Sequence, residues 1–167
     1  RTRAETLLAE RLPADPLTGQ GTDDGGSGKR LFIRLSPQQT VALETLSRHV
    51  SRSTRTALWS ALVIAVLARH KESGSAVLGL PFAGRVDQDS RQALGCFANV
   101  LPIAIAPDMT RGLADLVQQV GREILLMMDV QDYTLSRLSM DLSAMAHGPV
   151  GLPFDAVSVI EINEDID

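Results

Sequence analysis

The sequence has little of several residue types that mark particular classes of protein. It contains one cysteine among 167 residues, so no disulfide can form within the chain, as is typical of proteins of a reducing cytoplasm. Its 16 basic residues are scattered and outnumbered by 20 acidic ones, which argues against nucleic acid, whose phosphates need a clustered basic face. Its most apolar run, residues 57–68, falls short of the ~18–20 residues that a membrane helix needs. We therefore expect a cytoplasmic protein that binds neither nucleic acid nor a membrane.

The sequence also offers no motif for a metal or for a nucleophile. Its histidines, His49, His70 and His147, lack metal-ligand spacing, and no HxH, HExxH or CxxC pattern occurs. No GxSxG pattern occurs either. Cys96 stands among apolar residues, which predicts a small buried side chain rather than a nucleophile. We therefore predict no metal site and assign no catalytic residue within this chain.

Length and composition predict one folded unit. A chain of 167 residues with 44% hydrophobic residues can bury a substantial core. The first residue is arginine and no targeting pattern follows, so we expect a piece of a larger protein. Residues 4–12 have the pattern of a short helix that prolines end, and residues 18–30 are a flexible glycine-rich linker. We therefore divide the chain into residues 1–30, a helix and linker, and residues 31–167, the folded subdomain.

Hydrophobic periodicity predicts the order of helices and strands in the folded subdomain. Ser36 is the expected N-cap of one helix, and Thr110 that of a long amphipathic one. A helix that starts after a cap at Ser53 or Thr54 and ends near His70 is apolar on nearly all sides, so we expect it to be covered all round. A further helix is expected over residues 135–145, and strands over residues 31–35, 76–80, 100–106 and 156–162, the last buried on both faces. This order predicts an α/β fold, a two-layer sandwich of a mixed central sheet with helices packed on it.

A few polar residues stand out because they interrupt apolar stretches. Arg85 follows Gly84 in a turn of small residues, Asn99 precedes an apolar strand, and Gln131 and Asp132 follow the long helix. The residues alone leave two interpretations. They are surface residues of turns and helix ends, with Asn99 capping backbone groups, or they belong to a functional site.

Five stretches, in order, resemble the C-terminal half of a condensation domain of nonribosomal peptide synthetases. They are AETLLAERLPADPL (residues 4–17), the stretch of residues 30–70, VLGLPFAGR (77–85), LGCFANVLPI (94–103) and VQDY (130–133). The third ends in an Ala-Gly-Arg turn, the fourth is similar to the family's Gly-x-Phe-x-Asn-x-x-Pro motif, and the fifth to its Gln-Asp-Tyr/Val motif. Each motif is short, and their order along nearly the whole chain makes the resemblance specific.

The resemblance implies a half with the fold of chloramphenicol acetyltransferase. In the complete enzyme two such halves form a V, and the active site lies in a tunnel between them. Carrier proteins present an acyl donor and an amine acceptor on phosphopantetheine arms, and the amine attacks the thioester. Holding both tethered reactants together is worth ~7–11 kcal/mol of the barrier. The expected partners are therefore the N-terminal half of the same domain and carrier proteins, and no cofactor is expected to bind the chain directly.

The resemblance also implies roles for four residues. In the family the arginine of the Gly-Arg turn pairs with the aspartate of an HHxxxDG motif in the other half, so Arg85 would be a clamp across the interface. Asn99 would order the backbone near the tunnel, and Gln131 and Asp132 would line or support it. No HHxxxDG motif occurs in the chain, so the chain alone is expected to be inactive. The surface facing the missing half is expected to be apolar, which would favour dimerisation.

Some positions depart from the family pattern. Val130 stands where a histidine or asparagine is usual, residues 134–136 replace Pro-Phe-Glu, and Ala104 replaces an arginine. Three interpretations stay open. The chain belongs to an active condensation domain that forms amides or esters, or to a degenerate one that recruits or docks a partner protein. The third is an unrelated α/β domain or another acyltransferase of the same fold.

Overall fold

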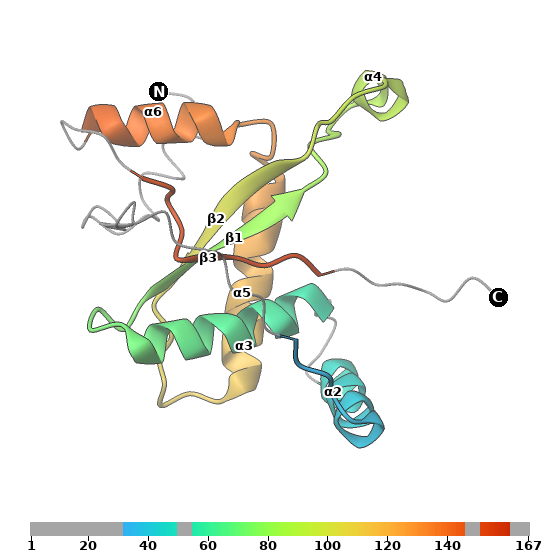
Figure 1. The fold of residues 1–167 in the computed structure, drawn as a ribbon, viewed down its shortest axis with the longest axis vertical. Coiled ribbons are helices and arrows are strands. Elements are labelled where there is room, and N and C mark those ends of the chain that lie inside the picture. Colours follow the sequence, from blue (N-terminus) through green and yellow to red (C-terminus); the bar gives the residue numbers. More distant parts are fainter. Residues whose placement is uncertain (1–31, 50–54, 146–150, 161–167) are drawn as a thin grey trace.

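The structure, a computed structural model, describes residues 32–49, 55–145 and 151–160 (Figure 1). Its helices are α2 (Pro37–His49), α3 (Arg55–His70), α4 (Gln88–Gln92), α5 (Leu113–Met128) and α6 (Leu135–Met145). Its strands are β1 (Ala76–Phe82), β2 (Asn99–Ile105) and β3 (Ala156–Val157). β1 lies between β2, its antiparallel neighbour, and β3, its parallel neighbour. The predicted α/β fold, with a mixed sheet and helices packed on it, is confirmed.

The core lies between the β1–β2 hairpin and two helices. The strands pair along their whole length, from Ala76 opposite Ile105 to Phe82 opposite Asn99. α3 packs on β1, α5 packs on β2, and the two helices pack against each other. α5 offers a continuous apolar face because apolar residues recur at every third or fourth position along it. The largest side chains buried in this core include Ile64, Leu78, Leu101, Ile103, Val117 and Val120.

α3 is buried on one face only. Ala61 and Ile64 are fully buried, whereas Val66 is 58% exposed. The prediction that this helix is covered all round is therefore wrong for the part of the chain that the structure describes. Periodicity could not identify the open face, because a helix with apolar residues on nearly all sides has no polar face to mark it. The neighbours α5 and β1 decide which side is buried.

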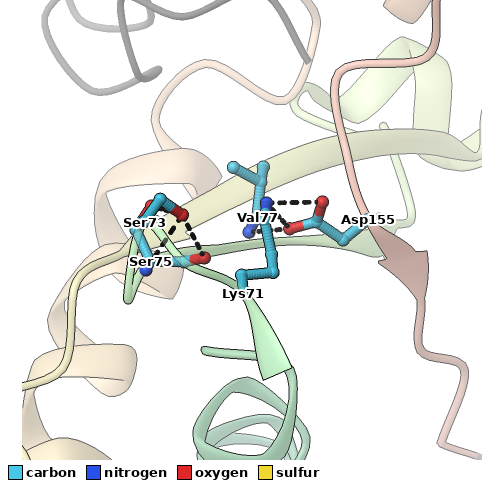
Figure 2. Close-up of polar contacts among 5 residues, drawn as sticks. All are labelled: Lys71, Ser73, Ser75, Val77 and Asp155. Atoms are coloured by element: carbon cyan, nitrogen blue, oxygen red, sulfur yellow. Dashed lines mark hydrogen bonds and ion pairs between the residues drawn. The ribbon is translucent and has the colours of Figure 1, made fainter. Parts of the chain in front are cut away.

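β3 is held on the sheet by a carboxylate just before it. Asp155 accepts hydrogen bonds from the Val77 N–H at 2.8 Å and from Lys71 Nζ at 2.8 and 2.9 Å (Figure 2). The Asp155 N–H in turn donates to the Val77 carbonyl oxygen at 2.8 Å. Lys71 directly follows α3, so this contact joins the end of that helix to both neighbouring strands.

Two of the predicted strands are corrected. Of the strand predicted over residues 156–162, the structure describes residues 156–160; within these, the regular strand is Ala156–Val157, and Val159 is 62% exposed. The prediction of burial on both faces is wrong for the described part of this segment, since Ala156 is half-buried and Val157 is 50% exposed. Residues 32–35 form no strand, and Phe32 is 82% exposed. Both segments have β-forming composition, but a strand also needs a hydrogen-bonding neighbour, and composition does not supply one.

Helix starts are predicted with mixed success. Ser36 is confirmed as a cap, because its Oγ accepts the Gln39 N–H at 3.2 Å and Gln39 Oε1 accepts the Ser36 N–H at 2.8 Å. Thr110 is not a cap. Its hydroxyl donates to the Asp108 carboxylate at 2.6 Å, and α5 begins after Gly112, which contributes no side-chain cap.

Several predictions fall outside the described residues. They concern the helix and linker of residues 1–30, the caps at Ser53 or Thr54, and His147. One short helix, α4, is absent from the predicted order, because its five residues, QDSRQ, have no apolar periodicity.

Candidate functional site

Arg85 organises the loop between β1 and β2. Its Nη1 group donates to the carbonyl oxygens of Ser90 and Ala93, the latter at 2.9 Å, and its Nη2 group donates to that of Gly95 at 3.0 Å. Its guanidinium carbon also lies 4.6 Å from the centre of the Phe97 ring, within the range of a cation–π contact. Arg85 therefore has partners in its own loop, and the carboxylate partner that the resemblance implies stays a prediction.

Residues 85–98, here named the tip loop, extend beyond the end of the hairpin (Figure 1). Within it α4 begins after Asp87, whose carboxylate accepts the Ser90 N–H at 2.6 Å. This hydrogen bond holds the pKa of Asp87 below its ordinary value. Leu94 and Cys96 are exposed, so the prediction of a buried Cys96 is wrong. Leu94 and Cys96 stand among apolar residues in the sequence, but the tip loop that carries them projects away from the core, so their side chains are not covered (Figure 1).

The turn at Gly84 brings the end of β1 against the residues that precede β2. Its φ of 67° lies in the left-handed region that favours glycine. A Cβ at this position would lie 1.9 Å from the Phe97 carbonyl oxygen, so no side chain fits unless the backbone moves. The Gly84 N–H donates to Gln131 Oε1 at 3.2 Å. Gly84 therefore closes the turn and also joins it to the residues after α5.

Asn99, the first residue of β2, joins the same segment through its side-chain amide. Its Nδ2 group donates to the carbonyl oxygens of Gln131 at 3.1 Å and Tyr133 at 2.8 Å, and its Oδ1 accepts the Leu135 N–H at 3.1 Å. Both N–H groups of the amide are thereby used. The segment that Asn99 holds, residues 129–134 between α5 and α6, is here named the connector.

Gln131 completes a polar cluster of three residues, Gly84, Asn99 and Gln131. Its Nε2 group donates to the Met128 carbonyl oxygen at 3.0 Å while its Oε1 accepts the Gly84 N–H. The polar cluster therefore joins the end of β1, the start of β2 and the end of α5 at a single point. The structure brings Asn99 and Gln131 together, and it places Arg85 immediately beside them through Gly84.

The residues on either side of Gln131 in the sequence differ in exposure to solvent. Asp132 is exposed and, in the stretches that the structure describes, makes no hydrogen bond to the polar cluster. Val130, which stands where the family pattern has a histidine or asparagine, is 3% exposed and packs in the core. The position is thus used for packing in this chain and contributes no polar group to the site.

A second polar group lies beside the connector. The Tyr133 hydroxyl donates to Asp141 Oδ2 on α6, and Arg137 Nε donates to the same oxygen at 3.2 Å. The hydrogen bond from Tyr133, more than the contact with Arg137, holds the pKa of Asp141 below its ordinary value. The Asp141 carboxylate in turn raises the pKa of Arg137. The connector is therefore fixed through the backbone by Asn99 and through a side chain by Asp141.

The chemistry of the polar cluster is that of a positioning device. Its side chains are amides, which hold backbone groups but neither take up nor release a proton near neutral pH. His70 is the histidine whose side chain lies within the described residues, and its Nδ1 is 2.8 Å from the Val66 carbonyl oxygen of its own helix. The cluster can therefore order the backbone, and it offers no general base.

Sequence reasoning missed two contributions to the site. The aspartate at 141 and the arginine at 137 have i,i+4 spacing on a predicted helix, and that spacing is a signal of an ion pair. The link from Asp141 to Tyr133 had no such signal, because it depends on how α6 folds back on the connector. The contact between Arg85 and Phe97 likewise depends on the path of the tip loop.

Solved structures that share this fold include condensation domains. The first condensation domain of the calcium-dependent antibiotic synthetase, in complex with substrate analogue 3a, aligns with a TM-score of 0.68 over 98% of this chain and 35% of that chain, at 22% identity. A four-domain nonribosomal peptide synthetase bound to AMP and glycine aligns with a TM-score of 0.59 over 70% of this chain and 9% of that chain, at 28% identity. The fold is therefore that of a condensation domain.

The family model described as "Condensation domain" matches residues 2–150, and the chain belongs to this family. It is 28% identical over 151 residues to AMB antimetabolite synthetase AmbB of Pseudomonas aeruginosa, covering 90% of this chain and 12% of that protein. It is 32% identical over 112 residues to a dimodular nonribosomal peptide synthase of Bacillus subtilis, covering 65% of this chain and 4% of that protein. The chain thus spans a small part of these relatives, and an unrelated α/β domain is excluded. No helix in the described stretches is long and apolar enough to cross a membrane.

Proposed function

We propose that the chain is part of the C-terminal half of a condensation domain and forms one wall of its tunnel. Nearly the whole chain aligns with about a third of a condensation domain structure, and this proportion leaves room for a second wall. The segments that carry the motifs, at Gly84, Asn99 and Gln131, meet at one end of the hairpin. That meeting point is the observation that carries the proposal, because residues far apart in sequence converge there through polar contacts.

In this function the chain supports formation of an amide or ester between two tethered reactants. The amine or hydroxyl of the acceptor attacks the thioester carbonyl of the donor, and the phosphopantetheine thiol leaves. The proton acceptor is a histidine of the HHxxxDG motif in the other half. Our chain supplies an ordered backbone wall that fixes the geometry between the reactants, and geometry of this kind is a large part of catalysis by proximity.

The proposed partners are the N-terminal half of the same domain and the carrier proteins. Arg85 is held by three carbonyl oxygens, which are neutral acceptors, so its charge suits a carboxylate on the other half. Val86, 47% exposed, and the fully exposed Leu94 suit an apolar contact with that half. Asp132 is exposed and is proposed to lie along the tunnel. In the isolated chain the same apolar surface favours dimers, and the cytoplasm is the proposed location.

Reconstitution with the other half tests the proposal. The chain alone, incubated with acyl-loaded and aminoacyl-loaded carrier proteins, should form no product. Addition of an N-terminal half that carries HHxxxDG should restore the carrier-bound amide, which mass spectrometry detects. Arg85→Gln should weaken the association of the two halves, while Arg91→Gln, at an exposed position of α4, should not. No product from a reconstituted domain with an intact HHxxxDG motif would refute the proposal.

A second candidate is a degenerate condensation domain that recruits or docks a partner protein. The burial of Val130 favours it, because a position that is polar in the family pattern is here part of the core. In that case the reconstituted domain should bind carrier proteins in calorimetry but form no amide. Absence of binding to every synthetase-associated protein tested would count against this candidate.

A further inference from the structure

Tyr133 is held at both of its ends. Its carbonyl oxygen accepts the hydrogen bond from Asn99 Nδ2 at 2.8 Å, and its hydroxyl donates to Asp141 Oδ2. Its N–H donates to the Val130 carbonyl oxygen at 3.0 Å, which closes a turn in the connector. The position of the connector therefore depends on two elements at once, β2 through Asn99 and α6 through Asp141.

α6 fixes the position of Asp141, because the helix is packed on the core and capped at its start. Leu138 is 2% exposed and anchors the helix in the core. The first turn is capped by Thr134, whose Oγ1 accepts the Arg137 N–H at 3.3 Å. Arg137 Nε also contacts Asp141 Oδ2 at 3.2 Å, so the carboxylate has a cation and a phenol as donors. The connector, in contrast, has no regular helix or strand of its own.

We propose that Asp141 is a positioning residue: through Tyr133 it sets the place of the connector, and with it the contacts of Gln131 and Asn99. The inference rests on the proposed function for its effect on catalysis, since it gives the tunnel wall a support from α6. Among the described residues Asp141 makes no hydrogen bond to a member of the polar cluster, so the link to the cluster runs through Tyr133.

Hydrogen exchange of two backbone amides tests the link in the chain itself. The Gly84 N–H is bonded to Gln131 and the Leu135 N–H to Asn99, so both report on the polar cluster. Tyr133→Phe removes the link, and Asp141→Asn weakens it because a neutral amide oxygen is a poorer acceptor than a carboxylate. Tyr133→Phe should accelerate exchange of both amides about tenfold, Asp141→Asn should accelerate it less, and the double variant should exchange no faster than Tyr133→Phe. The amide of Leu78, in the middle of β1, should be unaffected.

Asp115→Asn is the matched control. It breaks the Arg111–Asp115 pair, which has the same i,i+4 spacing, joins a residue just before α5 to the first turn of that helix, and lies at an exposed position. Exchange at Gly84 and Leu135 should then equal that of the unmodified chain. Unchanged exchange in both Asp141→Asn and Tyr133→Phe would overturn the proposal. If Asp141→Asn fails to fold, Tyr133→Phe, which keeps the ring and removes only the hydroxyl, still decides it.

An activity measurement in the reconstituted domain gives the second readout. Asp141→Asn should lower kcat for amide formation several-fold with an unchanged KM for the carrier-bound acceptor, and Asp141→Glu should recover most of the loss. Faster exchange with an unaltered kcat would overturn the positioning role. A reconstituted domain that is inactive before any substitution would refute the proposed function instead, and the exchange data alone would then decide the link between Asp141 and the connector.

Discussion

The two ends of the β1–β2 hairpin are held in different ways. At the end where Ala76 faces Ile105, buried apolar side chains of the sheet pack against α3 and α5. At the end where Phe82 faces Asn99, hydrogen bonds from Asn99 and Gln131 hold backbone groups of the connector and the turn. One end depends on the volume of its side chains and the other on the identity of single polar groups.

The difference predicts which parts of the domain tolerate substitution. An apolar core tolerates substitutions that conserve volume. A polar cluster does not, because each donor and acceptor there is matched to a particular backbone group and a mismatch leaves it unsatisfied. The polar residues of the motifs, Asn99 and Gln131, lie at the polar end, where single substitutions are expected to be least tolerated.

The largest effect is expected from a substitution that creates a cavity at the apolar end of the hairpin. Ile103 is 1% exposed and lies two residues from Ile105 in β2, so Ile103→Ala should lower the free energy of unfolding by about 2–5 kcal/mol. Ile103→Val, which keeps most of the volume, should cost only about 0.5–1.5 kcal/mol. Urea unfolding measures both. Equal costs for the two variants would show that volume does not govern this end.

The next effect is expected at Gly84. Gly84→Ala places a Cβ against the Phe97 carbonyl oxygen in a left-handed conformation, and it should cost about 3 kcal/mol. Gly74→Ala is the matched control, because Gly74 has a φ of 65° but nothing within 4 Å of the added Cβ. It should cost about 1 kcal/mol, the strain alone. The difference in urea unfolding midpoint between Gly84→Ala and Gly74→Ala measures the cost of the clash with the Phe97 carbonyl oxygen. Identical midpoints for the two variants would show that this clash costs nothing.

A smaller effect is expected at Asn99. Asn99→Ala leaves the Leu135 N–H and two carbonyl oxygens without their partner and should cost about 2 kcal/mol. Asn99→Asp keeps the shape but turns an oxygen toward the two carbonyl oxygens, so it should be no more stable than the alanine variant at neutral pH. Thermal unfolding compares the three proteins. An aspartate variant as stable as the original chain would show that the amide N–H groups are not needed.

The smallest effect is a dependence on pH at Asp141. Its pKa lies below the ordinary value, chiefly because Tyr133 donates to the carboxylate, so the unfolded state binds the proton more tightly than the folded state. The contact therefore stabilises the fold above about pH 4, and this stabilisation is lost as the pH falls through the lowered pKa. The gap in urea midpoint between the original chain and Tyr133→Phe should shrink from about pH 6 to about pH 3. A gap that stays constant would contradict the contact.

Much of the helical part of the fold could be predicted from the sequence. The spacing of apolar residues predicted the helix over residues 135–145 with the bounds of α6, and it predicted β1 and β2 to within two residues at each end. The apolar runs of β1 and β2 agree with their packing, since residues 76–80 and 101–103 are buried, and the spacing of α6 agrees with the burial of Leu138. Where the pattern was uniform, as in α3, or where the partner lies elsewhere, as for residues 32–35 and β3, the sequence predicted the wrong environment.

The site was predictable in its members but not in its contacts. Asn99 and Gln131 were identified from short motifs, and nothing in the sequence indicates that Asn99 binds the carbonyl oxygens of Gln131 and Tyr133. Those contacts depend on how the connector folds back on β2. Cys96 shows the opposite error, since apolar neighbours in sequence predicted a buried side chain that the projecting tip loop exposes.

The contact between Lys71 and Asp155 has a consequence for the order of folding. The two residues are 84 positions apart, so bringing them together costs about 4 kcal/mol of chain entropy by the logarithmic law of loop closure. The β1–β2 hairpin pairs residues that are much closer in sequence, at most from Ala76 to Ile105, and is expected to form first. β3 then joins after the rate-limiting step, so Asp155→Ala should speed unfolding and leave the refolding rate nearly unchanged.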